Sequence, residues 1–265
     1  MILEAINSFF QRIKAISVKN SFINEIYSKN RVIASYIISL LSGIKLKREA
    51  SKCRSIDDLI DLGLFFEYAP IKGLPFKLIF RTLQNRFEIT EFLKYIAKIQ
   101  PKLILEIGTA RGGTLYLLSR FSSPDAHVIS LDLPGGIHGG GYPRFRIPFF
   151  KTFVSKNQKL SLIRENSHDT STLKKIIKLL KDHKLDLLFI DGDHTYEGVK
   201  KDFEMYAPLV KPGGIIAFHD IAVHSPEINC YVDKFWNEIK KDFNFREILK
   251  EGDPRSLGIG VIIKM

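Results

Sequence analysis

Cysteine is scarce in this sequence, with only Cys53 and Cys230 among 265 residues. The two lie far apart and match no spacing typical of a zinc site or a redox pair. This scarcity excludes a disulfide scaffold and indicates free thiols in a reducing compartment. A charged segment followed by a small-residue cleavage site is also missing at the N-terminus, so no signal peptide is evident.

Long apolar runs are absent as well. The longest one near the N-terminus, residues 32–41, contains Ser and Tyr and falls well short of the ~20 residues that cross a bilayer. We therefore expect no transmembrane segment and a cytoplasmic location. Hydrophobic residues make up 45% of the chain, which is ordinary for a globular protein with a sizeable core.

Acidic residues are too few to balance the basic ones, and the formal net charge is +11. Residues 1–50 alone hold eight Lys or Arg against three Asp or Glu. Such a balance permits nucleic acid, an anionic membrane or an acidic glycan as a partner. No basic stretch is interleaved with aromatic residues, so a specific nucleic-acid partner is not expected. A solvated lysine-rich surface explains the charge equally well.

The first 85 residues are predicted to form a helical N-terminal extension. Its apolar spacing predicts two amphipathic helices within residues 1–42, the second following Asn30, and then a charged linker over 43–54. Such helices could cap the domain, contact substrate, form a homo-oligomer or lie peripherally on an anionic membrane. The apolar stripe of the second helix is made of Ile33, Tyr36, Ile37 and Leu40.

Residues 86–265 alternate short apolar runs with amphipathic helical segments. This alternation predicts an α/β domain built on a parallel sheet with crossover helices. The loop 252–257 is too short for a crossover helix, so the last two strands should pair antiparallel. The predicted strands are 103–107, 127–131, 160–164, 185–190, 215–218, 245–249 and 259–263, and the main helices 114–121, 171–180, 196–206 and 232–239.

Polar residues follow two of the buried strands at the point where each ends. Asp191 comes directly after residues 185–190, and His219 and Asp220 follow residues 215–218. Neighbouring parallel strands bring their carboxyl ends to one edge of the sheet, where open α/β sheets bind ligands. We therefore expect these three side chains to form a site.

A glycine-rich turn follows the first strand of the domain and reads E-I-G-T-A-R-G-G. Gly108, Gly112 and Gly113 permit close approach of a ligand, but their spacing differs from the G-x-G-x-x-G of nicotinamide-binding proteins. A carboxylate at Glu106 would repel a pyrophosphate but could pair with an ammonium group or bind hydroxyls, which suits S-adenosylmethionine. A plain β–α turn is the alternative.

Two further strand ends carry groups that suit a nucleoside. Asp132 stands where nucleotide-binding α/β folds place a carboxylate on ribose hydroxyls. Asn166 and Ser167 follow the third strand and are placed to touch an adenine ring. The run N-S-H-D-T-S that contains them would equally serve as an ordinary helix start.

Five motifs in order, E-I-G-T-A-R-G-G, L-D-L-P-G-G, E-N-S-H-D, F-I-D-G-D-H-T-Y-E-G and K-P-G-G-I-I-A-F-H-D, resemble the class I S-adenosylmethionine-dependent methyltransferases. Within them the chain is similar to the branch of cephalosporin-hydroxylase-like proteins and of rhamnosyl and macrolide-sugar O-methyltransferases. The resemblance covers about residues 87–263. It implies a Rossmann-like, doubly wound seven-strand sheet with an antiparallel last strand.

The resemblance also implies roles for individual residues. His194 would be the general base and Asp191 a second catalytic residue. A divalent metal, Mg²⁺ or Mn²⁺, would be held by Asp191, His219 and Asp220. S-adenosylmethionine would be contacted by residues of the glycine turn and of the strand ends, namely Glu106, Gly108, Thr109, Gly112, Asp132, Asn166 and Ser167.

One departure from that branch affects the metal. Macrolide-sugar relatives carry two adjacent acids where this chain has His219 and Asp220. Mg²⁺ prefers oxygen ligands, whereas imidazole suits Mn²⁺, Fe²⁺ or Zn²⁺. Either the metal is softer, or His219 is a base and Asp220 the remaining ligand, or a metal-free polar cluster supports the cofactor.

The function expected is O-methyl transfer to a sugar, glycan or glycosylated small molecule. Nucleic-acid methylation is an alternative, although the slot for its N/D-P-P-aromatic tetrapeptide reads D-G-D-H. Two further alternatives are a binding protein and a nicotinamide dehydrogenase with the same fold. The segment Gly135–Pro143 is interpreted as a mobile lid or a substrate loop. Arg144 and Arg146 could grip an anionic or sugar acceptor or belong to a solvated loop. The remaining histidines are interpreted as surface or loop residues, namely His138, His168, His183 and His224.

Overall fold

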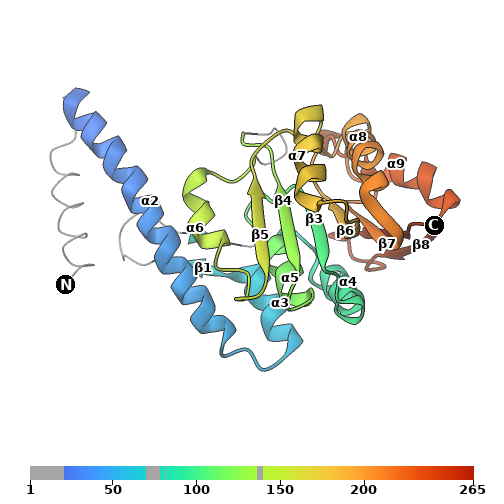
Figure 1. The fold of residues 1–265 in the computed structure, drawn as a ribbon, viewed down its shortest axis with the longest axis horizontal. Coiled ribbons are helices and arrows are strands. Elements are labelled where there is room, and N and C mark those ends of the chain that lie inside the picture. The colour runs from blue at the N-terminus through green and yellow to red at the C-terminus, as the bar shows by residue number, and fades with distance from the viewer. Residues whose placement is uncertain (1–20, 70–77, 81, 136–139) are drawn as a thin grey trace.

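The computed structural model describes residues 21–69, 78–80, 82–135 and 140–265, with side chains from residue 31 onward. The helix predicted from apolar spacing over residues 2–16 lies outside the described residues, as does His138. Element labels follow Figure 1.

A seven-stranded sheet forms the centre of the fold, in the order β5-β4-β3-β6-β7-β9-β8 (Figure 1). The first five strands in this order are parallel, and β9 pairs antiparallel with both β7 and β8. The doubly wound α/β sheet with an antiparallel last strand is thus confirmed. Its strands are β3 (Leu103–Ile107), β4 (His127–Leu131), β5 (Lys159–Ile163), β6 (Leu185–Ile190), β7 (Val210–His219), β8 (Asn244–Ile248) and β9 (Ile259–Ile263).

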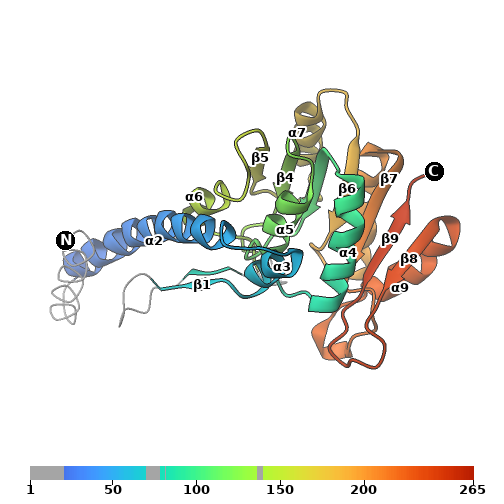
Figure 2. The same cartoon turned by 90° about the horizontal axis from the view of Figure 1, so that it is seen from below.

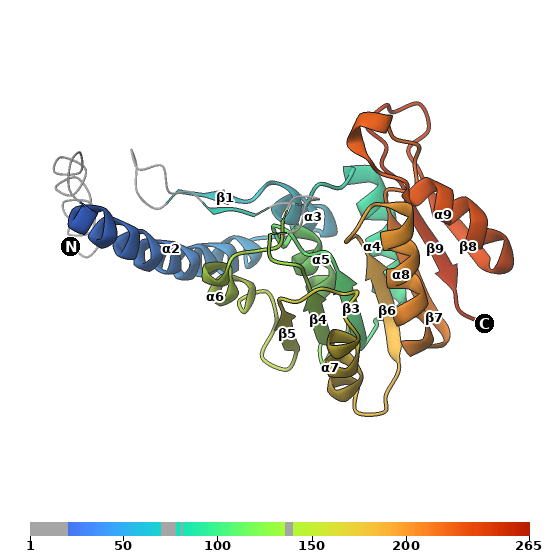
Figure 3. The ribbon, with the colours of Figure 1, turned by 90° about the horizontal axis from the view of Figure 1, so that it is seen from above.

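Helices cover both faces of the sheet. Figure 2 shows α4 and α5 in front of the sheet, and Figure 3 shows α7, α8 and α9 over the opposite face. Alternate strand residues serve the two sides, because Ile104 packs with the first group and Leu105 with the second. The helices are α3 (Ile56–Phe65), α4 (Arg86–Ile99), α5 (Gly113–Phe121), α7 (Thr170–Leu180), α8 (Tyr196–Tyr206) and α9 (Val232–Ile239).

The N-terminal part of the chain differs from its prediction. Helix α2 runs without interruption over Ser21–Ala50, so the predicted helix start after Asn30 is wrong, and the predicted linker over 43–54 is correct only over 51–54. The predicted apolar stripe does not cover the domain, since Ile33 and Leu40 are 57% and 52% exposed. The face that α2 buries carries the small residues Ala34, Ser39, Ser42 and Gly43, together with Ile38 and Leu46.

Close approach explains why small residues face the protein. Helix α2 packs on the short helix α6 (Ile147–Phe150), and Ser39 Oγ accepts a hydrogen bond from the backbone N–H of Phe149 at 3.2 Å. A Cβ on Gly43 would lie 2.5 Å from Thr152. The larger apolar residues are left on the outer face, and their contact with a second subunit or a membrane stays a prediction. None of the described helices has the length and apolar character that spanning a bilayer requires.

The described part of residues 1–85 shares a core with the rest of the chain. Ile38, Leu64 and Phe80 belong to the same apolar cluster as the helices on the α4–α5 face of the sheet. Phe80 makes edge-to-face contacts with Tyr116 and Phe149, at ring-centroid distances of 5.3 Å. The two-stranded hairpin of β1 (Glu67–Tyr68) and β2 (Leu78–Ile79) extends beside α2, away from the sheet (Figures 2 and 3).

Candidate active site

The site lies at the carboxyl ends of β3 and β6, where the order of the parallel strands reverses. Ligands bind at this point in open α/β sheets. The two strands meet closely, because a Cβ on Gly108 would lie 1.8 Å from the carbonyl oxygen of Asp191. Gly108 also has φ of +87°, a conformation that favours glycine. The turn after β3 is therefore fixed against the end of β6.

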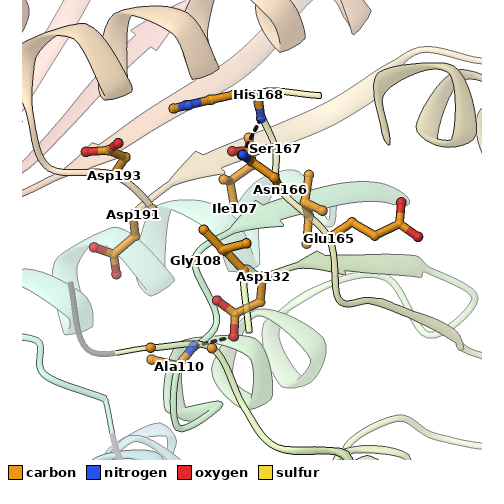
Figure 4. Close-up of a pocket in the computed structure, with 15 residues that line it drawn as sticks. Ile107, Gly108, Ala110, Asp132, Glu165, Asn166, Ser167, His168, Asp191 and Asp193 are labelled. Carbon is orange, nitrogen blue, oxygen red and sulfur yellow. Dashed lines mark hydrogen bonds between the residues drawn. The ribbon is translucent and has the colours of Figure 1, made fainter. Parts of the chain in front are cut away.

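A cavity of about 160 Å³ opens on one side of this crossing (Figure 4). Asp132 lines it from the end of β4 and is nearly buried. Its Oδ2 accepts hydrogen bonds from the backbone N–H groups of Ala110 at 3.2 Å and Tyr142 at 3.0 Å. Burial raises the pKa of Asp132, although these hydrogen bonds act in the opposite direction. The carboxyl group is thereby held at the cavity wall.

Residues after β5 form the far wall of the same cavity. Asn166 and Ser167 both line it, and Asn166 Oδ1 accepts a hydrogen bond from the backbone N–H of His168 at 2.9 Å (Figure 4). His168 was interpreted as a surface or loop histidine, but it lines this wall too. Its Nε2 lies 3.3 Å from Asp202, which is fully buried. The Asp202 pair raises the pKa of His168, because a nearby negative charge favours the imidazolium.

Three of the predicted cofactor contacts do not line the smaller cavity. Glu106 is fully buried behind the turn, lines neither cavity described here, and accepts a hydrogen bond from the Thr109 hydroxyl. Burial raises the pKa of Glu106 well above its usual value, so the structure favours a neutral, supporting group there. Gly112 has φ of +88° and packs against Phe150, whereas Thr109 lines the second cavity.

The second cavity, of about 550 Å³, shares Gly108, Ala110 and Asp191 with the first. His219 at the end of β7 has Nδ1 3.0 Å from Asp191 Oδ1 and 3.3 Å from Asp220 Oδ2. His194 lies between the same two acids, with Nε2 3.5 Å from Asp191 Oδ1 and Nδ1 3.1 Å from Asp220 Oδ2. The structure thus brings all four predicted residues into one cluster.

The charges in this cluster support one another. Burial lowers the pKa of His194, but hydrogen bonds with Asp191 and Cys230 and the charges of both acids raise it to about 11. Burial is likewise outweighed at His219, where Asp220 and Asp191 raise the pKa to about 10. Both histidines in turn hold the pKa of Asp191 well below its usual range despite burial. Without a further cation, the cluster consists of two imidazoliums and two carboxylates.

The cluster has the donor atoms of a metal site, and one of its residues has a strained backbone conformation. Donor atoms of Asp191, His219 and Asp220 all lie within 4.8 Å of one another, and those of His194, Asp220 and Cys230 do the same. His219 Nε2 is buried and has no hydrogen-bond partner. Asp220 has φ of +61°, which costs free energy in a residue other than glycine and is concentrated at functional sites. These residues fit a divalent cation by donor chemistry and by spacing.

Several residues around the second cavity were not predicted as site residues. His224 was interpreted as a surface or loop histidine, yet it lines the cavity with Nε2 3.6 Å from Asp220 Oδ1. Cys230 was predicted only as a free thiol. Arg111 approaches from the glycine turn. Of the two arginines interpreted as able to grip an acceptor, Arg146 lines the cavity and Arg144 does not. Sequence patterns could not place the unpredicted residues, because they reach the cavity from loops or short 3-10 turns; other unpredicted lining residues are Thr82, Leu83, Ile228 and Leu257.

A doubly wound sheet of this order, with a glycine turn after β3 and a carboxylate after β4, is the arrangement that the resemblance to class I S-adenosylmethionine-dependent methyltransferases implied. Residues 105–221 match the family described as methyltransferase domain, and this span includes Gly108, Asp132, Asp191 and His219. The match supports the prediction of an S-adenosylmethionine-dependent methyltransferase.

Curated relatives are distant. The chain is 27% identical over 186 residues to an uncharacterized protein of Acanthamoeba polyphaga mimivirus, covering 65% of this chain and 76% of that protein. It is 25% identical over 171 residues to an uncharacterized protein of Sinorhizobium fredii, covering 62% of this chain and 17% of that protein.

Solved structures with similar folds include the O-methyltransferase from Bacillus cereus in complex with S-adenosylhomocysteine, at 20% identity and a TM-score of 0.49. That similarity covers 66% of this chain and 80% of the other. A putative caffeoyl-CoA O-methyltransferase from Staphylococcus aureus is 22% identical with a TM-score of 0.47, covering 66% and 83% of the two chains.

Proposed function

We propose that this methyltransferase transfers its methyl group to a hydroxyl of a sugar, a glycan or a glycosylated small molecule. The observation that carries the proposal is the position of Asp191 on the walls of both cavities. A donor in the smaller cavity and an acceptor in the larger one would meet at this residue. Methyl transfer needs little beyond in-line alignment of the donor sulfur, the methyl carbon and the acceptor oxygen.

The smaller cavity suits the nucleoside part of S-adenosylmethionine. Asp132 would accept hydrogen bonds from the ribose hydroxyls, and Asn166 with Ser167 would contact the adenine edge. The turn that contains Gly108 would lie along the methionine part. Glu106, buried behind this turn, would support it through Thr109 rather than contact the cofactor directly.

Asp191, His219 and Asp220 would hold a divalent cation. A bound cation would lower the pKa of an acceptor hydroxyl and fix its direction toward the methyl group. The mixture of carboxylate and imidazole donors suits Mn²⁺, Fe²⁺ or Zn²⁺ better than Mg²⁺, which prefers oxygen ligands alone. A sugar with two neighbouring hydroxyls offers the chelating oxygens that such a cation would bind.

His194 would take up the proton that the acceptor hydroxyl loses. It lies within 3.5 Å of both Asp191 and Asp220, and its partly exposed ring lines the larger cavity. In the cluster alone the imidazole carries a proton. A second positive charge on the two acids would disfavour that proton, which leaves His194 able to act as a base.

Two measurements test the proposal. Calorimetry should detect binding of S-adenosylmethionine and no binding of NAD. Nuclear magnetic resonance of products formed from methyl-labelled donor and a panel of mono- and oligosaccharides should then show the label on oxygen. Binding of NAD in place of S-adenosylmethionine, or label found on nitrogen or carbon of the accepted substrate, would refute it.

A further inference from the structure

The larger cavity has two cationic side chains on its wall. Arg111 follows Ala110 in that turn, and Arg146 belongs to the short helical segment η1 (Arg144–Arg146). They are linked directly, because Arg146 Nη1 donates a hydrogen bond to the backbone carbonyl oxygen of Arg111 at 3.1 Å. Two guanidinium groups thus share one part of the cavity wall.

The acids of the cavity do not neutralise these arginines. Asp191 and Asp220 are the carboxylates on its wall, and both are engaged by His194 and His219 at 3.0–3.5 Å. Over the part of the chain that the structure describes, neither Arg111 nor Arg146 forms an ion pair with any carboxylate.

Like charges held close together without a counter-ion are unfavourable, and the free energy rises with burial. The cost is visible at Arg146, where burial first and then the charge of Arg111 lower the pKa of the guanidinium to about 10. A bound anion would remove this cost. Guanidinium groups bind carboxylate and phosphate through paired hydrogen bonds, which gives direction as well as charge.

The wall of the cavity therefore combines two kinds of polar group. It holds the two arginines and the cluster of Asp191, His194, His219 and Asp220, together with apolar side chains such as Leu83 and Leu257. A molecule that satisfies both groups needs an anionic group for the arginines and a hydroxyl for the cluster.

From this arrangement we infer that the acceptor is an anion: its carboxylate or phosphate binds Arg111 and Arg146, and its hydroxyl lies at Asp191. The inference rests on the proposed function, since it identifies the substrate class of the same cavity. The carboxylate of the S-adenosylmethionine methionine part has the same chemistry and is the competing occupant.

The test uses variants that change charge alone. Arg111→Gln is the main variant, because the side chain of Arg111 makes no hydrogen bond or ion pair among the described residues. Arg146→Gln removes the second charge and keeps an amide donor for the carbonyl of Arg111. Arg144→Gln is the matched control, since Arg144 is exposed, lies in the same segment and does not line the cavity.

Binding is measured by calorimetry with the full chain saturated with S-adenosylhomocysteine, using glucuronate, glucose 6-phosphate and glucose as probes. We expect at least one of the two anions to bind about tenfold or more tightly than glucose, a difference of about 1.4 kcal/mol. Arg111→Gln and Arg146→Gln should abolish this preference, and Arg144→Gln should retain it. Equal binding of all three probes by the unchanged protein would overturn the inference.

A second arm separates the cofactor from the acceptor. If the arginines bind the methionine carboxylate, Arg111→Gln weakens S-adenosylmethionine binding tenfold or more and leaves the probe preference unchanged, which also overturns the inference. Failure of the proposed function is recognised differently. If the labelled methyl group appears on oxygen of charged and neutral acceptors alike, only the inference of an anionic acceptor is refuted. If the label appears on nitrogen while the preference for anionic probes is intact, only O-methylation is refuted.

Discussion

Asp191 is the residue on which both halves of the site depend. Its carbonyl oxygen lies against Gly108, and its side chain accepts contacts from His194 and His219. We expect Asp191→Asn to lower methyl transfer at least 100-fold and to change the affinity for S-adenosylmethionine less than threefold, because the amide keeps the shape and loses the charge.

The measurement is transfer of labelled methyl groups alongside calorimetry of the cofactor. Asp182→Asn is the matched control, since Asp182 is exposed in the turn after α7 and precedes the start of β6, whereas Asp191 follows its end. Unimpaired transfer in Asp191→Asn would contradict the role given to this carboxylate.

His219 offers a direct test of the cation site. We expect His219→Ala to weaken binding of Mn²⁺ at least tenfold, because a three-donor set loses its imidazole. Calorimetry of Mn²⁺ with the cofactor-free protein measures this without any need for activity. His183→Ala, at an exposed position, should leave the affinity unchanged. Equal binding by both variants would place the ion elsewhere or remove it.

His127 determines part of the acid stability. It lies on β4, half-buried, with Nε2 2.8 Å from Ser161 Oγ, and burial with nearby Lys159 lowers its pKa to about 4. The unfolded chain takes up this proton near pH 6.5 and the folded chain does not, so stability falls as pH decreases from about 6.5 to 4.

His127→Gln keeps an amide near Ser161 and has no proton to gain. The difference between its free energy of unfolding and that of the unchanged protein should therefore shift in favour of the variant by about 1 kcal/mol between pH 7 and pH 4.5. Urea unfolding at both pH values gives this difference. A pH-independent difference would show that His127 has the same pKa in the folded and the unfolded chain.

At the scale of elements, the crossing of β3 and β6 sets the geometry of the site. Gly108→Ala should destabilise the protein by more than about 3 kcal/mol, because the added Cβ overlaps the Asp191 carbonyl. Gly135→Ala is the matched control. It has φ of +76° but nothing within 4 Å of the added atom, so only backbone strain of about 1 kcal/mol is expected.

Urea unfolding of the two variants separates steric overlap from strain. Equal losses in the two would mean that the strands move apart at little cost, and the site would then be less rigid than the crossing indicates.

The sequence was sufficient to predict the bounds of strands whose apolar run ends abruptly at a polar residue or a glycine. The bounds of β3, β6 and β9 were predicted to the residue, because their apolar runs stop at a glycine, an acid or a lysine. The convergence of Asp191, His219 and Asp220 followed from the same ends. Such predictions succeed where the apolar pattern of a segment depends on that segment's own burial in the sheet.

Helix α2 shows why other predictions failed. Apolar spacing selects the largest side chains as the buried face, whereas α2 buries Ala34, Ser39 and Gly43 because α6 lies close against it. No local pattern contains that neighbour. The pairing of Arg111 with Arg146 was hidden for the same reason: residues 35 apart in the chain meet only after the fold has formed.

At the scale of the whole molecule, residues 34–80 and the methyltransferase domain depend on one another. Ile38, Leu64 and Phe80 fill one cluster with Phe149 and Phe153. Removal of residues 1–85 would expose this aromatic cluster to water, at a cost of roughly 1.5–3 kcal/mol for each large side chain uncovered. We therefore expect a chain of residues 86–265 to lose cooperative unfolding.

Circular dichroism during urea unfolding, together with binding of a dye that reports exposed apolar surface, measures this outcome against the full chain. A truncated chain that unfolds cooperatively, with unchanged affinity for S-adenosylmethionine, would show that the domain boundary at residue 86 separates independent units.

The contact between Gly108 and the carbonyl of Asp191 has a consequence for anyone who wishes to re-engineer this enzyme. Random mutagenesis at this crossing would disturb the alignment of donor and acceptor together, and few variants would keep activity. Leu83, Ile228 and Leu257 line the same cavity but belong to neither strand of the crossing. Randomising these three positions offers new acceptors while Gly108 and Asp191 stay unchanged.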